Sequence, residues 1–296
     1  MKVLVVSGFL GSGKTTFIET LSKKIEKFIV VLENEYGEVG IDGDILKKDD
    51  IEIWELTEGC VCCTIKANFA TSILTIYNSL NPDLLIVEPT GLGMLSAVLD
   101  NIRKIEYERI EILDPITIVD ATAIDKHEEE FEEIFTDQIQ TSNKAIISKL
   151  SLIDEEKINE VEWKIKQRNP NIQVHKKEFN DLDDVFWADL LEDYLDMDFE
   201  YIEKNIQLSV DSLGLEGIEF ENLFDFQQNM SAIISGRFGK VLRVKGFLKI
   251  NGVWSRVDIV NDIYTLTKIE EMPESKLVFI GKNLEKDELN ILFNNK

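Results

Sequence analysis

The sequence comprises 296 residues, of which 44% are hydrophobic and 30% charged, and its formal net charge is −24 at pH 7. So strong a negative charge repels nucleic acid and anionic membrane surfaces, and we therefore expect neither as a partner. The sequence contains no apolar run of about 18 residues, the length needed to cross a membrane, and no basic segment before a long apolar stretch at its start. We accordingly expect a cytoplasmic protein with one large domain or two.

The start of the chain carries a phosphate-binding motif. Four apolar residues, Val3 to Val6, lead directly into GFLGSGKT at residues 8–15, which matches the P-loop pattern G-x-x-x-x-G-K-[ST]. An amphipathic helical pattern follows, so the motif has the strand-to-helix context that its mechanism requires. Lys14 is expected to reach the β- and γ-phosphates, and the Thr15 hydroxyl to ligate Mg²⁺. The residues predicted to bind the nucleotide here are Gly8, Gly11, Ser12, Gly13, Lys14, Thr15 and Thr16.

A second element of the phosphate site follows a later apolar strand. A P-loop needs an acidic residue at the end of a neighbouring strand to hold the water shell of Mg²⁺. Residues 83–88, DLLIVE, end in Glu88, which we expect to fill this role, and Gly91 lies where a backbone N–H can meet the γ-phosphate. The ordinary alternative is a carboxylate that merely ends a strand.

Buried strands and amphipathic helices alternate over the first part of the chain. This alternation predicts an α/β domain with a mostly parallel sheet flanked by helices, which we place at residues 1–204. Its acidic end, 178–203, favours a solvated helix at the domain edge over a surface that docks a partner. Strands are expected at 3–6, 28–32, 51–56, 83–87, 114–119, 144–147 and 172–175, and helices after the P-loop and at 67–80, 92–104, 127–143 and 154–167.

The pattern changes after about residue 204, where strand-like runs joined by tight turns take over. We expect a separate, smaller α+β domain at residues 205–296, and Asn251-Gly252 is a strong hairpin signal within it. Strands are expected at 206–212, 217–220, 240–250, 252–260, 263–268 and 276–281, and helices at 221–235 and 284–293.

Three cysteines, Cys60, Cys62 and Cys63, lie within four positions of one another. An odd, clustered set does not make a disulfide framework, and in the cytosol such clusters bind soft or borderline metals. Cys60 and Cys62 are closer in sequence than the C-x₂-C pair of zinc ribbons, so a standard finger is not expected. Two or three sulfurs would bind the metal, with water, a carboxylate or a partner residue completing the coordination. Buried thiols and a redox switch remain alternatives.

The base-reading segment departs from the guanine-specific pattern. Guanine-specific P-loop proteins follow a buried strand with Asn-Lys-x-Asp, whose Asp accepts two hydrogen bonds from the base. Here residues 148–151 read Ser148, Lys149, Leu150 and Ser151. Ser148 and Lys149 are predicted to bind the nucleotide, with the Lys149 stem over the base, but Ser151 cannot form a charged bidentate pair. We therefore expect a weak preference for GTP, with ATP as an option.

The chain resembles the CobW-like family of metal-chaperone GTPases, relatives of the nickel-insertion GTPases for urease and hydrogenase. The segments GFLGSGKTT, ENEYGEVGID, TEGCVCC and EPTG occur in the order and spacing of that family. In the C-terminal part, LRVKGF at 242–247 and KLVFIG at 276–281 look like its characteristic strands. The resemblance covers nearly the whole chain.

The resemblance implies that nucleotide binding and slow hydrolysis are coupled to the handling of a transition metal, Zn²⁺ or Co²⁺, for a client metalloprotein. The cysteine cluster is the family's metal motif. Glu33, Glu35 and Glu38 belong to the segment that resembles the family's nucleotide-responsive switch and can add carboxylate ligands. Glu38 or Asp42 is the candidate for orienting the attacking water. The chain lacks the histidine-rich loop of many members, so nickel is a less favoured candidate metal than Zn²⁺ or Co²⁺. We assign no role to His127 or His175.

Two other classes of function compete with this interpretation. In a P-loop small-molecule kinase or ligase, the cysteines would have a purely structural role. In a non-hydrolysing metal buffer or regulator, the P-loop would have no function. The oligomeric state, monomer or homodimer, is open.

Overall fold

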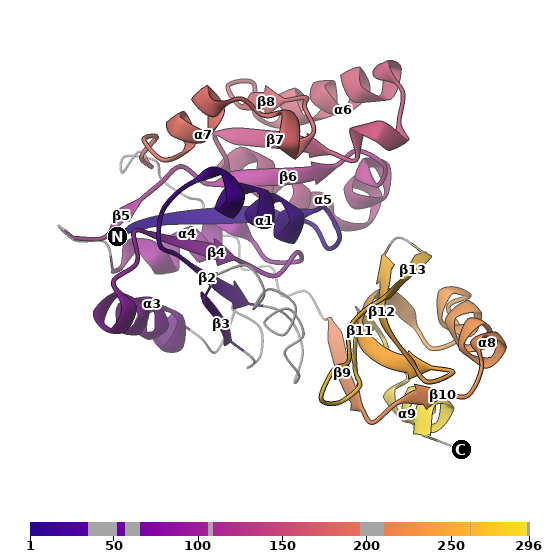
Figure 1. Ribbon diagram of the computed structural model, residues 1–296. Coiled ribbons are helices and arrows are strands. Elements are labelled where there is room, and N and C mark those ends of the chain that lie inside the picture. The colour runs from indigo at the N-terminus through magenta and orange to yellow at the C-terminus, as the bar shows by residue number, and fades with distance from the viewer. Residues whose placement is uncertain (35–51, 57–65, 106–108, 196–209, 261, 295–296) are drawn as a thin grey trace. The chain divides into compact units, whose positions relative to one another are not determined.

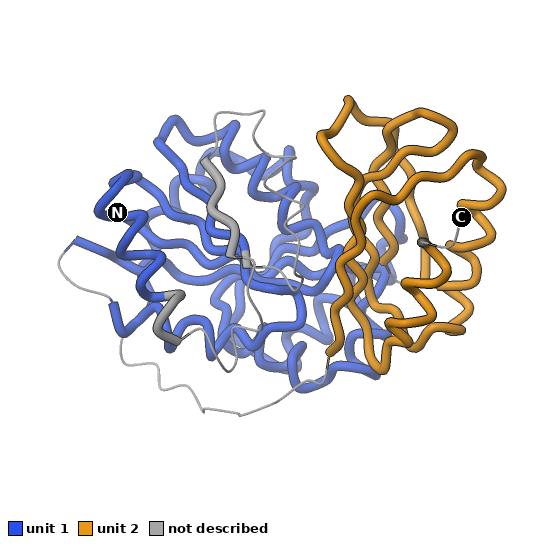
Figure 2. The backbone as a smooth tube through the Cα atoms, turned by 90° about the horizontal axis from the view of Figure 1, so that it is seen from below, with its two compact units in different colours: residues 1–35, 46–56, 60–205 blue, residues 36–45, 57–59, 206–296 orange. Residues whose placement is uncertain are grey.

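The computed structural model describes residues 1–34, 52–56, 66–105, 109–195, 210–260 and 262–294 (Figure 1). The chain forms two compact units, shown in blue and orange in Figure 2. The larger unit contains the elements from β1 to α7, and the smaller unit those from β9 to α9. The predicted boundary between residues 204 and 205 lies outside the described residues and stays a prediction.

The larger unit is built on an eight-stranded sheet in which all the paired strands run parallel. The strand order is β3-β2-β4-β1-β6-β7-β8, and the two-residue strand β5 pairs with β1. The parallel α/β fold expected from the alternation is thereby confirmed. The strands are β1 (Lys2–Gly8), β2 (Ile29–Asn34), β3 (Glu52–Leu56), β4 (Leu84–Glu88), β5 (Glu111–Ile112), β6 (Ile116–Asp120), β7 (Lys144–Ser148) and β8 (Gln173–His175).

Helices cover both faces of this sheet (Figure 1). Because successive strand residues point to opposite faces, Leu4 and Val6 pack with α1 and α7, whereas Val3 and Val5 pack with α3 and α4. The helices are α1 (Lys14–Lys24), α3 (Lys66–Leu80), α4 (Leu95–Arg103), α5 (Ile124–Thr141), α6 (Glu155–Arg168) and α7 (Asp184–Leu190), with 3₁₀ turns η1 (Leu150–Leu152) and η2 (Phe179–Asp181).

The acidic end of the larger unit is only partly a solvated helix. Helix α7 ends at Leu190, and Asp183 caps its start by accepting a hydrogen bond from the Phe186 backbone N–H at 3.0 Å. Trp187 is buried and stacks on Phe17 of α1, with ring centroids 5.5 Å apart. The acidic side chains between the apolar ones remain at the surface, so this segment closes the core beside α1 while its other face meets solvent.

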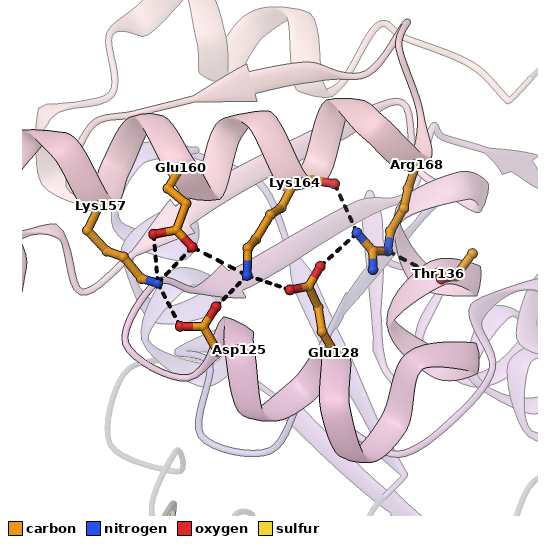
Figure 3. Close-up of polar contacts among 7 residues, drawn as sticks. All are labelled: Asp125, Glu128, Thr136, Lys157, Glu160, Lys164 and Arg168. Carbon is orange, nitrogen blue, oxygen red and sulfur yellow. Dashed lines mark hydrogen bonds and ion pairs between the residues drawn. The ribbon is translucent and has the colours of Figure 1, made fainter.

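Helices α5 and α6 are joined by a network of ion pairs (Figure 3). Asp125 and Glu128 of α5 both pair with Lys164 of α6, and Asp125 also pairs with Lys157 at 2.7 Å. Arg168 of α6 pairs with Glu128 at 2.8 Å and lies over the Phe135 ring. The network fixes α6 against α5, although the backbone of α5 is irregular at Phe131, where φ is −143°.

The smaller unit is an antiparallel sheet covered on one face by two helices. The strand order is β13-β12-β11-β14-β9, and the two-residue strand β10 pairs in parallel with β11. Phe226, Met230 and Phe293 of the helices pack on Val244 and Phe279 of the sheet. Its elements are β9 (Asp211–Glu216), β10 (Glu219–Phe220), α8 (Leu223–Ile234), β11 (Lys240–Ile250), β12 (Val253–Val260), β13 (Ile263–Lys268), β14 (Lys276–Lys282) and α9 (Lys286–Asn294).

The predicted hairpin turn at Asn251-Gly252 joins β11 to β12. Both residues have positive φ, 50° and 72°, which is the conformation that a two-residue turn between twisted strands requires. The antiparallel sheet and the two helices of this unit confirm its predicted α+β character.

Across the described residues of both units, no helix has the length and apolar character needed to cross a membrane.

Candidate functional site

The P-loop connects the carboxyl end of β1 to the first turn of α1. Gly8, Gly11 and Gly13 have φ values of 139°, 69° and 102°, which residues other than glycine rarely adopt. No side chain caps the start of α1, and its first turn holds no acidic residue. The backbone N–H groups of that turn, together with the helix dipole, favour an anion at this position.

Two glycines allow other segments to approach the loop closely. A Cβ at Gly8 would lie 2.4 Å from the Ile118 carbonyl oxygen of β6. A Cβ at Gly91 would lie 2.3 Å from the Leu10 nitrogen, so the segment after β4 packs directly on the loop backbone. Gly91 therefore lies at the P-loop, as its position in the sequence predicted, while its contact with a γ-phosphate stays a prediction.

The Lys14 ammonium is held inside the loop. The side chain is buried, and Nζ donates hydrogen bonds to the carbonyl oxygens of Gly8 at 3.0 Å and Phe9 at 3.1 Å. Nζ also lies 3.8 Å from Oε1 of Glu88. Carbonyl and carboxylate oxygens thus stabilise the buried charge at the point where phosphate oxygens are expected to bind.

Glu88 and Thr15 bring an acidic and a hydroxyl oxygen together at the end of β4. Thr15 Oγ1 donates a hydrogen bond to Glu88 Oε2 at 3.4 Å. Oxygen ligands of this kind suit Mg²⁺, which binds through few protein groups and keeps several waters. Ser12 and Thr90 are close in sequence to Thr15 and Glu88, respectively. Their hydroxyls are buried and have no hydrogen-bond partner among the described residues. The donor set therefore fits a magnesium–triphosphate group.

Glu33 lies beside this pair of residues in the sheet. The register of β2 and β4 places Glu33 opposite Glu88, and the register of β2 and β3 places it opposite Glu55. Glu33 is 5% exposed. Since partners in neighbouring strands lie about 5 Å apart, the predicted metal ligand Glu33 is next to the predicted magnesium residue Glu88. Sequence reasoning did not single out Glu55.

The carboxyl end of β7 contacts the P-loop from the other side. Ser148 Oγ donates a hydrogen bond to the Ser12 carbonyl oxygen at 2.6 Å. Lys149 has a φ of 59°, and its Nζ pairs with the buried Asp120 carboxylate at 2.5 Å. Of the predicted nucleotide-binding residues, Ser148 is therefore brought to the loop and Lys149 to Asp120 at the end of β6, whereas Ser151 is exposed.

His127 packs on the P-loop, a contact that sequence reasoning missed. Its ring stacks on Phe9 with centroids 4.0 Å apart and an interplanar angle of 11°. Burial lowers the pKa of His127 to about 4, against a smaller opposing effect of the Asp120 carboxylate. His127 is therefore a neutral, aromatic support of the loop at pH 7. A lone histidine on a helix carries no signal that could have predicted this role.

Thr16 is exposed in the first turn of α1. The remaining predicted site residues, Glu35, Glu38, Asp42, Cys60, Cys62 and Cys63, lie outside the described residues. Within the part of the chain that the structure describes, no group of three His, Cys, Asp or Glu side chains is placed to hold a metal ion. The predicted transition-metal site therefore stays a prediction.

The family of the chain follows from two matches that together span most of its length. Residues 2–176 match the family described as CobW/HypB/UreG, nucleotide-binding domain. The chain belongs to the CobW/HypB/UreG family. Residues 217–295 match the cobalamin synthesis protein CobW C-terminal domain, which confirms the resemblance stated for both parts of the sequence.

Individual members of the CobW/HypB/UreG family are similar over different spans. The "zinc chaperone YjiA" of Escherichia coli (strain K12) is 26% identical, covering 98% of this chain and 97% of the relative. The "zinc chaperone CobW" of a Sinorhizobium species is 32% identical over a shorter span. The match covers 55% of this chain and 55% of that relative, so this chain spans only about half of its length. A zinc-bound triple mutant of the YjiA GTPase shares the fold, with a TM-score of 0.50 and 21% identity over 100% of this chain and 98% of that one.

Proposed function

We propose that this protein is a nucleotide-dependent metallochaperone. It binds and slowly hydrolyses GTP, or ATP, with Mg²⁺, and it carries Zn²⁺ or Co²⁺ to a client metalloprotein in the cytoplasm. The observation that carries the proposal is the arrangement of Lys14, Thr15 and Glu88 around a glycine-lined loop at the start of α1. Membership in the CobW/HypB/UreG family and the zinc-chaperone names of two relatives support the metal cargo.

The nucleotide is held by the loop that the structure describes. The backbone N–H groups of the loop and of the first turn of α1 bind the phosphate oxygens, and Lys14 reaches the β- and γ-phosphates. Thr15 and Glu88 would hold Mg²⁺ and its water shell, and the ion neutralises negative charge on the phosphate oxygens. Glu38 or Asp42 orients the attacking water. Little in the sequence resembles a dedicated arginine finger, which accounts for slow hydrolysis.

The cargo metal is held by Cys60, Cys62 and Cys63, with Glu33 and Glu38 as carboxylate ligands. Thiolates suit Zn²⁺ and Co²⁺, and a coordination sphere shared between loops can open for transfer. Glu33 supports a link between the two sites, because the register of β2 and β4 places it opposite Glu88. A change at the magnesium site can therefore alter the position of a cargo ligand in the neighbouring strand.

Such a link must act in both directions. If triphosphate binding orders the segment that carries metal ligands, hydrolysis releases it and weakens the hold on the metal. Thermodynamic linkage then requires that the metal change nucleotide affinity by the same factor.

The experiment measures Zn²⁺ affinity by competition with a chromogenic chelator in three states: with a non-hydrolysable triphosphate, with a diphosphate and without nucleotide. The full chain is compared with the Cys62→Ser, Cys63→Ser double variant. We expect different affinities in the three states and a large loss in the variant.

Equal affinities in all three states, or an unaffected double variant, would contradict the proposal. A rate of nucleotide hydrolysis that is unaffected by Zn²⁺ and Co²⁺ but depends on a small-molecule phosphate acceptor would instead indicate a P-loop kinase or ligase. Metal binding without any nucleotide binding would indicate a buffer or regulator.

A further inference from the structure

The base-reading position of the nucleotide site lacks its expected carboxylate. Ser151 stands where guanine-specific P-loop proteins have an aspartate, and the next acidic residue, Asp154, has another function. Asp154 is the N-cap of α6, and its Oδ1 accepts a hydrogen bond from the Lys157 backbone N–H at 2.8 Å. This cap holds the Asp154 carboxylate at the start of α6, three positions beyond Ser151.

A different carboxylate lies at Ser151. Oε1 of Glu178, which follows β8, accepts a hydrogen bond from the Ser151 backbone N–H at 3.0 Å. Among the described residues, no lysine or arginine neutralises Glu178. The two nearest lysines in sequence pair elsewhere, Lys176 with Glu162 at 2.7 Å and Lys177 with Asp183 at 3.1 Å. Since a carboxylate has about four acceptor positions, most of the capacity of Glu178 remains available.

The segment that carries Glu178 also contacts the P-loop. A Cβ at Gly13 would lie 3.4 Å from the ring of Phe179, the residue after Glu178, and 3.9 Å from Cβ of Ser148. Strands β7 and β8 are parallel neighbours, so the segments after their carboxyl ends open on the same edge of the sheet as the P-loop. A nucleotide whose phosphates lie on the loop therefore extends its base toward Ser151 and Glu178.

We propose that Glu178 is the specificity-determining residue that reads the base of the nucleotide. Its carboxylate accepts hydrogen bonds from the N1–H and the exocyclic amino group of guanine, while the Ser151 N–H holds the carboxylate in place. Adenine presents an acceptor at N1, which a carboxylate repels. This inference rests on the proposed nucleotide-binding function, and it replaces the weak preference for GTP suggested by Ser151 alone with a clear one.

The test compares wild type with Glu178→Gln in competition titrations with GTP, ATP and xanthosine triphosphate. Xanthine carries a carbonyl where guanine carries the amino group, so an amide at position 178 can donate to it. Wild type should prefer GTP over ATP by about a hundredfold, the worth of a charged bidentate contact. Glu178→Gln should lose about tenfold or more in GTP affinity and gain affinity for xanthosine triphosphate.

The matched control is Asp181→Asn, which removes the same charge from an exposed residue three positions further on. It should leave all three affinities unchanged. Wild type that binds GTP and ATP equally, or a Glu178→Gln variant with wild-type preferences, would overturn the role of Glu178 and leave the nucleotide site intact. Wild type that binds no nucleotide at all would instead overturn the proposed function.

Discussion

Thr15 and Glu88, which are 73 positions apart in the chain, are joined by a hydrogen bond of 3.4 Å from Oγ1 to Oε2. Thr15 belongs to the first turn of α1, and Glu88 ends β4, the strand beside β1 in the sheet. This contact unites the two sequence motifs of the phosphate site. It also places the buried Lys14 ammonium 3.8 Å from the same carboxylate, so that Glu88 lies beside both the lysine and the hydroxyl of the P-loop.

We predict that Lys14→Ala lowers triphosphate affinity or turnover by about tenfold or more, because it removes the charge that meets the β- and γ-phosphates. Isothermal titration and a phosphate-release assay measure the two effects. Lys24→Ala, in the last turn of the same helix and exposed, is the matched control and should behave as wild type. Unchanged binding and hydrolysis in Lys14→Ala would disprove the phosphate-site assignment.

We predict that Gly91→Ala impairs nucleotide binding because the added methyl group displaces the backbone of the P-loop. Its Cβ would lie 2.3 Å from the Leu10 nitrogen and 2.6 Å from the Phe9 carbonyl carbon, so the loop backbone must move. Nucleotide affinity should fall about tenfold, and stability by about 1–3 kcal/mol, as for other overpacked sites.

Gly93→Ala is the comparison for this prediction, since its nearest contact would be 3.1 Å and includes no P-loop atom. Its effect on nucleotide affinity should be small. Equal affinities of the two variants would show that close packing at Gly91 does not determine the shape of the loop.

His127 should make stability depend on pH below neutrality. Its folded-state pKa, lowered by burial to about 4, lies below the ordinary value of 6.5, so the unfolded chain binds the proton more readily. The contribution of His127 to the free energy of unfolding should therefore be fully present above pH 6.5 and be lost as the pH falls toward 4. The loss amounts to about 3 kcal/mol, since one pKa unit corresponds to about 1.4 kcal/mol.

The measurement is urea unfolding at several pH values for wild type and His127→Phe. The variant keeps an aromatic ring against Phe9 but cannot titrate, so its stability should fall less steeply between pH 6.5 and 4. Because the slope is compared, a change in overall stability does not obscure the result. Parallel slopes for the two proteins would rule out His127 as the source.

Lys164 should contribute more to stability than an ordinary surface lysine. Burial by itself lowers its pKa, but hydrogen bonds with Asp125 and Glu128 outweigh that effect and raise it (Figure 3). The side chain is 15% exposed, and removing it leaves, among the described residues, Asp125 paired with Lys157 alone and Glu128 with Arg168 alone. Lys164→Met should therefore lower the free energy of unfolding by about 1–3 kcal/mol.

Lys166→Met serves as the control, because Lys166 is exposed on the same helix and should change stability by no more than about 0.5 kcal/mol. Urea midpoints at low and high salt measure both variants. A Lys164→Met variant that matches Lys166→Met at low salt would mean that the network adds no net stability.

The sequence by itself determined the elements and the phosphate motif of this protein. The P-loop, the acidic end of β4 and the hairpin at Asn251-Gly252 are local patterns, whose physical cause lies within a few residues of chain. The alternation of strands and helices along the chain likewise predicted a parallel sheet flanked by helices. The acidic composition of the segment favoured a solvated helix, whereas the packing of Trp187 of α7 on Phe17 depends on the tertiary structure.

The tertiary structure alone decided which distant residues meet. Glu33 lies opposite Glu88 because the strand order places β2 beside β4, and Glu178 reaches Ser151 because β8 lies beside β7. His127 stacks on Phe9 because α5 follows β6, the neighbour of β1. Local periodicity carries no information on strand order or on the path of a crossover, since these depend on how all the apolar faces are buried together.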